Sequence, residues 1–383
     1  MIPIANRLDH TNEYYFSSKL REVKTLQQQG KPIINLAIGS PDLPPDQSVI
    51  DAIQNAVKQD NAHQYQSYQG IPELRQAMSQ FYQTNYNVNL DPNTEILPLM
   101  GSKEGIMHIS MAFLNPNDQV LIPNPGYPTY TSVTNLVGAI PLFYDLLPQN
   151  NWQPDFQKLE QQNLENVKIM WVNYPNMPTG EAGNLDLYQK LINFAKKHKI
   201  LIINDNPYSL VLNQNPISIL QIPEAQNHVL ELNSLSKTYN MAGWRVGMVC
   251  GSTNLLTPIL TVKSNMDSGM FFGIQKGAIA ALQLPKTWID TQNNTYNNRR
   301  KLIFELAHHL NCSFDTHAVG LFVWAKLPPQ ITDTEQFVND LLYQKNIFIT
   351  PGTIFGSNGN GYIRFSLCQN EHQIQEAINR IKT

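Results

Sequence analysis

The chain has 383 residues, of which 42% are hydrophobic and 15% charged, and its formal net charge is −3. This composition is typical of a folded globular protein, because disordered chains have fewer hydrophobic and more charged residues. With 27 basic and 30 acidic side chains there is no basic excess, so we expect no nucleic-acid partner. The length suggests two or three domains of roughly 150 residues each.

The sequence carries no sign of export or of a membrane span. Its first 16 residues lack a basic start followed by an apolar run, and no stretch reaches about 18 uninterrupted apolar residues. Cys250, Cys312 and Cys368 are too few and too dispersed for a disulfide framework or a zinc cluster, so no metal site is expected. They fit a reducing compartment. We therefore expect a soluble, cytoplasmic protein with no membrane partner.

From about residue 94 the chain alternates short β-branched runs with longer helical runs. Several of the short runs are apolar on both faces, as strands buried in a parallel sheet are. The clearest helical run, 186–198, has one apolar stripe. This alternation predicts an α/β fold with a mostly parallel sheet between two layers of helices. Strands are expected at 94–99, 118–123, 140–146, 167–174, 200–206, 229–235 and 244–251.

The last hundred residues have a different pattern, which predicts a smaller α+β domain. Helices are expected at 297–310, 335–345 and 371–381, and strands at 318–327 and 361–367. We expect residues 41–285 to form the large domain and residues 286–383 the small one. The N-terminal segment, 1–40, is expected to contribute to the small domain.

Polar residues follow four of the expected strands, at the edge where ligands bind in open α/β sheets. The segment GSKEGI (101–106) is a glycine-serine turn before a helix, whose free N–H groups suit a phosphate. NYPNMPTG (173–180) is a rigid turn, NDNPYS (204–209) carries Asp205 and Tyr208, and 233–247 carries Ser234, Ser236, Lys237 and Arg245.

One chemical scheme uses all four strand ends. A lysine amine forms an imine with an aldehyde cofactor, and an aspartate keeps a pyridine nitrogen protonated, so that the ring accepts carbanion electrons. Serines, an arginine and a helix N-terminus hold a phosphate. These features predict a pyridoxal-phosphate site. A nicotinamide enzyme is not favoured, because no G-x-G-x-x-G follows a strand.

The motifs resemble those of the class I/II aminotransferases with the aspartate aminotransferase fold, which is fold type I of pyridoxal-phosphate enzymes. The run SLSKTYNMAGWRVG (234–247) looks like the lysine signature of that family. NYPNMPTG is similar to its N-P-x-N-P-T-G, and NDNPY to its D-x-x-Y. The likeness also covers INLAIGSPD (34–42), QYQSYQGIPELR (64–75), PNPGYPTY (123–130) and YIRFS (362–366), so it spans almost the whole chain in order.

The resemblance implies that Lys237, Asp205 and Tyr208 are catalytic. Lys237 is the expected Schiff-base lysine, which moves a proton between the substrate α-carbon and the cofactor. Asp205 is expected to pair with the ring nitrogen, Asn176 and Tyr208 to bond the phenolic oxygen, and Tyr127 to stack on the ring.

The remaining implied roles concern the phosphate and the substrate. The phosphate pocket is expected to comprise Gly101, Ser102, Lys103, Ser234, Ser236 and Arg245. Tyr65 is expected to reach the phosphate of a neighbouring subunit, which implies a homodimer with shared active sites. Arg364 is expected to pair with the substrate α-carboxylate, with Asn176 beside it, and Gly39 to let the chain approach that carboxylate.

Two departures from the family pattern bear on the site. Met177 precedes Pro178 and Tyr174 precedes Pro175, and neither is expected to disturb the asparagine role. VKSNMDSG (262–269) offers no arginine for a side-chain carboxylate; Lys103 or Lys263 is a candidate substitute. GSKEG and DSG are closest in style to the diaminopimelate-, alanine- and aspartate-type branch.

The expected reaction moves an amino group between an L-amino acid and a 2-oxo acid. The same cofactor residues also serve a carbon–sulfur β-lyase or a related elimination, so this alternative stays open. A non-enzymatic regulator on the same fold is disfavoured for two reasons. It needs an appended DNA-binding module, for which we expect no room before the first family motif near residue 34. The intact Lys237 also argues against it.

Overall fold

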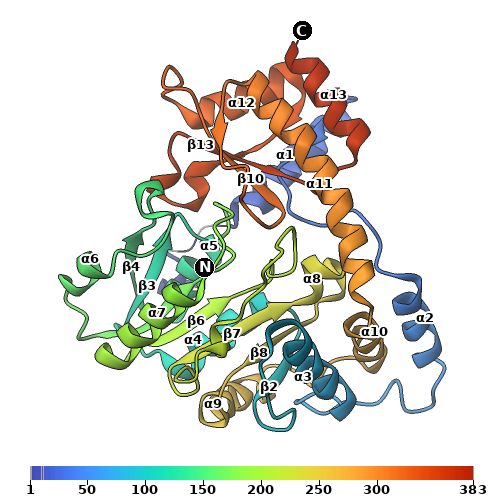
Figure 1. Cartoon of the computed structure of the whole chain (residues 1–383), viewed down its shortest axis with the longest axis vertical. Coiled ribbons are helices and arrows are strands. Elements are labelled where there is room, and N and C mark those ends of the chain that lie inside the picture. Colours follow the sequence, from blue (N-terminus) through green and yellow to red (C-terminus); the bar gives the residue numbers. More distant parts are fainter. Residues whose placement is uncertain (1, 10, 12, 383) are drawn as a thin grey trace.

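A computed structural model describes residues 2–9, 11 and 13–382, and its main feature is a seven-stranded sheet (Figure 1). Strands β7, β6, β5, β3 and β4 are mutually parallel, whereas β8 is antiparallel to both of its neighbours, β2 and β7. The expected α/β fold is thereby confirmed. In sheet order the strands are β2 (Ile96–Leu99), β8 (Gly247–Cys250), β7 (Val229–Ser234), β6 (Leu201–Asp205), β5 (Val167–Val172), β3 (Gln119–Asn124) and β4 (Ile140–Asp145).

Helices cover both faces of this sheet. One face packs against α4 (Ser102–Phe113), α5 (Pro128–Leu136) and α9 (Thr253–Ser264). The other packs against α3 (Pro72–Tyr86), α7 (Leu185–His198), α10 (Phe272–Leu282) and the short α6 (Phe156–Glu160). Successive residues of a strand alternate between the faces, as on β5, where Met170 joins one core and Trp171 the other. This explains why the strands are apolar throughout.

A second, four-stranded antiparallel sheet lies beside the first (Figure 1). Its order is β12 (Thr350–Pro351), β13 (Tyr362–Ser366), β10 (Phe322–Lys326) and β9 (Ser313–Phe314). Helices α11 (Lys286–His309), α12 (Thr334–Lys345) and α13 (Glu371–Lys382) accompany it. Helix α11 begins eleven residues before its expected start. Its first turns are polar in sequence, so the apolar pattern did not indicate them. In the structure Trp288 and Ile289 hold these turns by packing beside α10.

The N-terminal segment packs with the elements of this second layer. Helix α1 (Tyr15–Gln28) contributes Phe16 and Val23 to a core shared with Leu342 and Phe348. Strand β1 (Ile34–Asn35) pairs in parallel with β11 (Ile347–Phe348). Helix α2 (Gln47–Ala56) then leads to the other layer, where it packs on α10. The chain thus enters the α+β layer before it builds the large sheet.

The shortest elements lie mainly in connections. Helix α8 (Leu235–Thr238) follows β7 directly. The 3-10 helices are η1 (Asn6–Leu8), η2 (Pro148–Asn150), η3 (Ile219–Gln221), η4 (Ala242–Trp244), η5 (Gly352–Phe355) and η6 (Ser357–Gly359). The strand expected at 244–251 begins only at Gly247, because Arg245 has a left-handed backbone with a φ of +58°.

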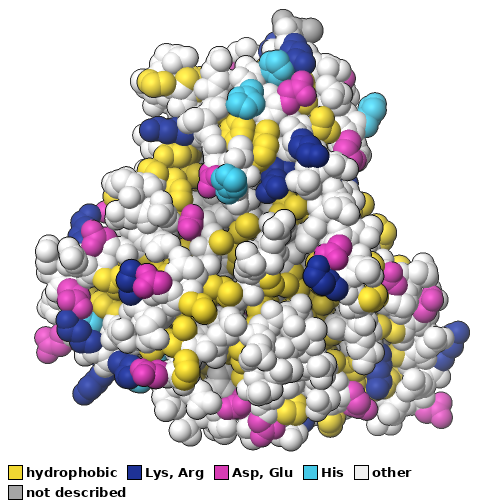
Figure 2. Space-filling model, in the orientation of Figure 1, with side chains coloured by type: hydrophobic (Ala, Val, Ile, Leu, Met, Phe, Trp, Pro, Cys, Tyr) yellow, Lys and Arg dark blue, Asp and Glu magenta, His cyan; other side chains and the backbone are white. Residues whose placement is uncertain are grey.

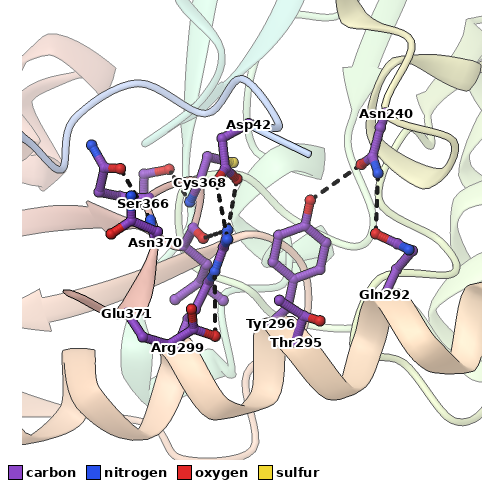
Figure 3. A network of polar contacts seen from close by, with 12 residues as sticks. Asp42, Asn240, Gln292, Thr295, Tyr296, Arg299, Ser366, Cys368, Asn370 and Glu371 are labelled. Atoms are coloured by element: carbon purple, nitrogen blue, oxygen red, sulfur yellow. Dashed lines mark hydrogen bonds and ion pairs between the residues drawn. The ribbon is translucent and has the colours of Figure 1, made fainter. Parts of the chain in front are cut away.

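A polar network joins α11 to the loops that surround the cavity described below (Figure 3). The buried Arg299 donates to both carboxylate oxygens of Asp42, at 2.6 and 2.9 Å, and to the Leu367 carbonyl. Tyr296, one turn earlier, donates its hydroxyl to Asn240, which follows α8. The helix that connects the two sheets is therefore bonded to both.

The face of the molecule shown in Figure 2 has no large patch of charges of one sign. Figure 2 shows Lys and Arg side chains interspersed with Asp and Glu over the face that it presents. Within the described residues no helix has the length and apolarity needed to cross a membrane.

Candidate active site

A cavity of about 590 Å³ lies at the carboxyl ends of β5, β6 and β7, between the two sheets and α1. Eleven of the fourteen residues expected in the site line it. They are Gly39, Ser102, Lys103, Tyr127, Asp205, Tyr208, Ser234, Ser236, Lys237, Arg245 and Arg364. Segments from residues 39 to 364 therefore converge on one place.

Lys237 lies in the middle of this cavity, in the single turn of α8. Its Nζ donates to the carbonyl oxygen of Gly39 at 2.5 Å. Burial, together with the charges of Arg364 and Arg245, lowers the pKa of this amine. A lowered pKa makes the amine available as a nucleophile and as a proton carrier.

Asp205 ends β6 as a buried carboxylate with one side-chain partner. Oδ2 accepts a hydrogen bond from the Tyr130 hydroxyl at 2.9 Å, while Oδ1 has no partner within the described part of the chain. Burial raises the pKa of Asp205 to about 6. A buried carboxylate with a vacant acceptor fits a ligand that brings an N–H donor.

Gly101 shapes the end of the cavity beside the first turn of α4. Its φ is +89°, and a Cβ there would lie 2.1 Å from Nη2 of Arg245. Only glycine therefore lets the arginine approach the N–H groups that open α4, although Gly101 itself does not line the cavity. Ser234 and Ser236, whose hydroxyls are 2.9 Å apart, lie close by after β7. Together these groups form a cup for an anion.

Arg364, on β13, brings a buried cation without a carboxylate partner to the opposite end. Nη2 donates to the Ala37 carbonyl at 2.8 Å and Nη1 to the Met177 sulfur at 3.2 Å, whereas Nε has no partner among the described residues. The rings of Phe322, Phe355 and Phe16 surround the guanidinium at 3.9, 4.7 and 5.6 Å. Burial lowers the pKa of Arg364 to about 10. Among the described residues, therefore, no carboxylate neutralises the Arg364 guanidinium.

The structure corrects the placement of Asn176. Its Oδ1 accepts from the backbone N–H and the hydroxyl of Thr179, at 3.3 and 2.8 Å, while its Nδ2 is buried without a partner among the described residues. The side chain does not line the cavity. Met177 lines the cavity instead. Alignment of N-P-x-N-P-T-G on Pro178, Thr179 and Gly180 likewise puts Met177 where the motif has its second asparagine. The expectation that the departure leaves the asparagine role intact is therefore wrong.

Three other expectations can be compared with the geometry. Lys263 is buried and paired with Asp267 at 2.7 Å, so it does not serve a substrate carboxylate. Gly39 lines the cavity and leaves room for the Phe322 ring, which lies 2.2 Å from a hypothetical Cβ at this position. Tyr65 is 90% exposed and lies outside the cavity of its own chain.

Several cavity residues were missed from the sequence. Tyr130, the partner of Asp205, stacks on Trp171 with ring centroids 4.9 Å apart. Its position three residues after Tyr127, on a helix that starts at Pro128, was an available signal. Tyr14 and Phe322 carried no such signal. Tyr14 directly precedes α1, and Phe322 begins β10 of the second sheet, so both reach the cavity only through tertiary packing.

Comparison with known proteins gives the same family as the motifs. The family model "Aminotransferase class I and II" matches residues 31–381. A curated LL-diaminopimelate aminotransferase of Aquifex aeolicus is 38% identical, with 100% of this chain and 99% of that protein covered. One from Maridesulfovibrio salexigens is 38% identical, with 99% and 98% covered. The substrate-bound BacF structure from Bacillus subtilis has a TM-score of 0.95 at 32% identity, covering 100% of this chain and 98% of that one.

The chain belongs to the class I and II aminotransferases. It is a pyridoxal-phosphate-dependent aminotransferase with the type I fold. The residues present fit this cofactor, because the cavity joins an anion cup, a lysine with a lowered pKa and a buried carboxylate oxygen without a partner.

Replacing Gly101 by Ala should weaken cofactor binding. The added Cβ displaces Arg245 from the anion cup, and loss of one charge-assisted contact corresponds to about a tenfold or greater rise in Kd. Gly30→Ala is the matched control, since Gly30 has a similar φ of +84° and nothing within 4 Å of the added atom. Titration of each apoprotein with pyridoxal phosphate checks this; equal Kd values for the two variants would contradict it.

The stabilisation that the cofactor gives should grow as the pH rises from about 4 to about 6 and level off above that. Between the ordinary pKa of an aspartate, 3.8, and about 6, Asp205 stays neutral in the apoprotein while the unfolded chain has ionised it, so the stability of the apoprotein falls by up to about 3 kcal/mol over this range. A protonated ring nitrogen offsets the charge that Asp205 carries above this range. Thermal unfolding of apoprotein and holoprotein from pH 4 to 8 checks this, with Asp205→Asn as the control for phosphate ionisation. An identical pH trend in Asp205→Asn would contradict it.

Proposed function

We propose that the protein transfers the amino group of a diaminopimelate-type amino acid, one with a second amino-acid group on its side chain, to a 2-oxo acid. The similarity to relatives named LL-diaminopimelate aminotransferases supports this substrate. The observation that carries the proposal is a pair of cations at different places in the cavity, Arg364 and Lys103, neither of which is paired with a carboxylate among the described residues. A substrate with two carboxylates matches them.

Arg364 binds the α-carboxylate in this proposal. Its guanidinium is held by the Ala37 carbonyl and by the three phenylalanine rings, with Nε vacant. A planar guanidinium can bind a carboxylate through two parallel hydrogen bonds. The bound carboxylate supplies the negative charge that this buried cation lacks.

Lys103 binds the distal carboxylate. Its Nζ lies 4.6 Å from the centre of the Tyr14 ring, which comes from the N-terminal segment on the substrate side of the cavity. Partial desolvation and the charge of Arg245 lower the pKa of Lys103, so an anion nearby is favourable. With Lys263 committed to Asp267, Lys103 is the candidate that remains of the two.

Lys237 moves the proton in the reaction. When bound, pyridoxal phosphate supplies an electron sink for the charge left at the substrate α-carbon. Asp205 would hold the ring nitrogen, Tyr208 would donate to the phenolic oxygen, and Tyr127 would stack on the ring. The phosphate would be held by Gly101, Ser102, Ser234, Ser236 and Arg245. The Lys237 amine would carry the proton away from the substrate α-carbon and return it.

The protein acts as a homodimer in the cytoplasm in this proposal. An exposed apolar patch supports a second copy: Tyr65, Tyr68, Met266 and Phe271 are 90%, 44%, 63% and 40% exposed. The two segments that carry it lie side by side, because a Cβ on Gly269 would lie 2.3 Å from the Gln66 carbonyl. Burial of such a patch is favourable. Tyr65 then reaches the phosphate in the partner's site.

The substrate proposal is tested with Lys103→Met. We expect the KM for LL-diaminopimelate to rise about tenfold or more, because a charge-assisted contact is lost, while the KM for L-alanine changes little. Lys31→Met, at an exposed position, is the control. An equal loss for both substrates, together with weaker cofactor binding, would instead assign Lys103 to the phosphate. Release of ammonia without an oxo-acid acceptor would favour the elimination alternative.

The dimer is tested with Met266→Glu. A carboxylate in the centre of the patch should convert the protein to a monomer and weaken cofactor binding, because Tyr65 no longer reaches a neighbouring site. Leu185→Glu, at a 50% exposed apolar residue on α7, is the matched control and should leave both properties unchanged. Sedimentation and cofactor titration measure the outcome; a fully active monomer would refute the placement of Tyr65.

A further inference from the structure

Met177 brings a thioether to the cavity from a turn that also holds two amide side chains. Asn173 lines the cavity, but its amide accepts from the Met177 N–H at 2.7 Å and donates to the Asp205 carbonyl. Asn176 accepts from Thr179 and does not line the cavity; its Nδ2 is buried without a partner among the described residues. A thioether accepts hydrogen bonds weakly and donates none. At position 177 itself the turn therefore presents no donor to the cavity.

The shape of the pyridoxal ring tells which part of the cofactor faces Met177. The ring nitrogen is opposite the aldehyde carbon, and the phosphate-bearing and phenolic carbons flank that carbon on its two sides. Asp205 fixes the nitrogen end, Lys237 the aldehyde end, and the cup of Gly101, Ser102 and Arg245 the phosphate side. The phenolic oxygen is then on the remaining side.

Tyr208 and Met177 occupy that remaining side. Both belong to the core cluster that contains Phe322 and Phe355, around Arg364, away from the anion cup. Met177 contacts Arg364 through its sulfur at 3.2 Å, and Tyr208 packs against Phe322 with ring centroids 5.7 Å apart. Of these two neighbours only the Tyr208 hydroxyl can donate a hydrogen bond.

We propose that Met177 leaves the phenolic oxygen with the single donor Tyr208, and thereby keeps the imine between Lys237 and the cofactor protonated to a higher pH than an amide at this position would. This inference rests on the cofactor roles proposed above. Met177 is a positioning residue here, because it acts through the environment of the oxygen and not on the substrate.

The charge on the phenolic oxygen determines whether a donor raises or lowers the pKa of the imine. While the imine is protonated, its proton shares the negative charge of the phenolic oxygen; when the proton leaves, the oxygen carries that charge alone. A donor to the oxygen therefore stabilises the unprotonated form more and lowers the pKa of the imine. Withholding a donor raises that pKa.

Other charged and titratable groups face the same point and set its absolute pKa. From the large sheet and its helices these are Asp205, Tyr208, Tyr127, Tyr130, Arg245 and Lys103. From the second sheet and the N-terminal segment they are Arg364, Cys368 and Tyr14. A substitution at position 177 keeps these residues but removes the sulfur contact to Arg364, a change that Met177→Asn and Met177→Leu share. A comparison of these two variants therefore isolates the effect of the added donor.

The test is a pH titration of the visible absorption band of the holoenzyme in wild type, Met177→Asn and Met177→Leu. Asparagine adds an amide donor, so its transition should fall by about one to two pH units, as one hydrogen bond to a charged group implies. Leucine removes the sulfur without adding a donor, and its transition should match that of wild type. An unchanged transition in Met177→Asn, or an equal shift in Met177→Leu, would overturn the inference.

Tyr208→Phe provides a second measurement that does not depend on the folding of Met177→Asn. If Tyr208 is the sole donor, its removal should raise the transition by about one pH unit or more. An unchanged transition would overturn the inference. A protein that takes up no cofactor, or whose cofactor borohydride does not fix to the peptide containing Lys237, would overturn the proposed cofactor roles themselves.

Discussion

The burial of one carboxylate, at the end of a central strand, is the constraint around which this site is built. Asp205 is buried at the wall of the cavity, and within the described part of the chain the Tyr130 hydroxyl is its one side-chain hydrogen-bond partner. That tyrosine is in turn held by the parallel Trp171 ring, from the neighbouring strand β5. The carboxylate position is therefore fixed by the sheet and by α5 together. A ligand that enters must satisfy an oxygen that the chain leaves open.

The site also depends on how the second sheet is placed against the carboxyl ends of the large sheet. The groups for the cofactor come from the strand ends of the large sheet, whereas Arg364 comes from β13. Helix α11 spans the two layers, and Arg299 and Tyr296 bond it to Asp42, Leu367 and Asn240 (Figure 3). Because Asn240 follows Lys237 by three residues, the same helix holds segments of both halves of the site.

Most of the site was predictable from the sequence because its residues follow buried parallel strands, whose carboxyl ends share one edge. Lys237, Asp205 and Ser234 are of this kind. Arg364 needed the family resemblance, because an antiparallel strand in a second sheet carries no comparable signal. The role of Asn176 in the turn at 173–180 was misassigned for a local reason. Two asparagines, Asn173 and Asn176, precede Met177, and only the hydrogen bonds of each amide show how its side chain is placed. Tyr14 depends wholly on how α1 packs.

The aromatic surroundings of Arg364 have a consequence for selectivity. Three phenyl rings shield the guanidinium from water, so its charge is poorly solvated before any ligand arrives. A primary amine that has lost its carboxyl group leaves this charge as it was, whereas the parent amino acid neutralises it. With Arg364 in its proposed role, the enclosure would discriminate against decarboxylated amines by the electrostatic cost of leaving a buried ion unpaired.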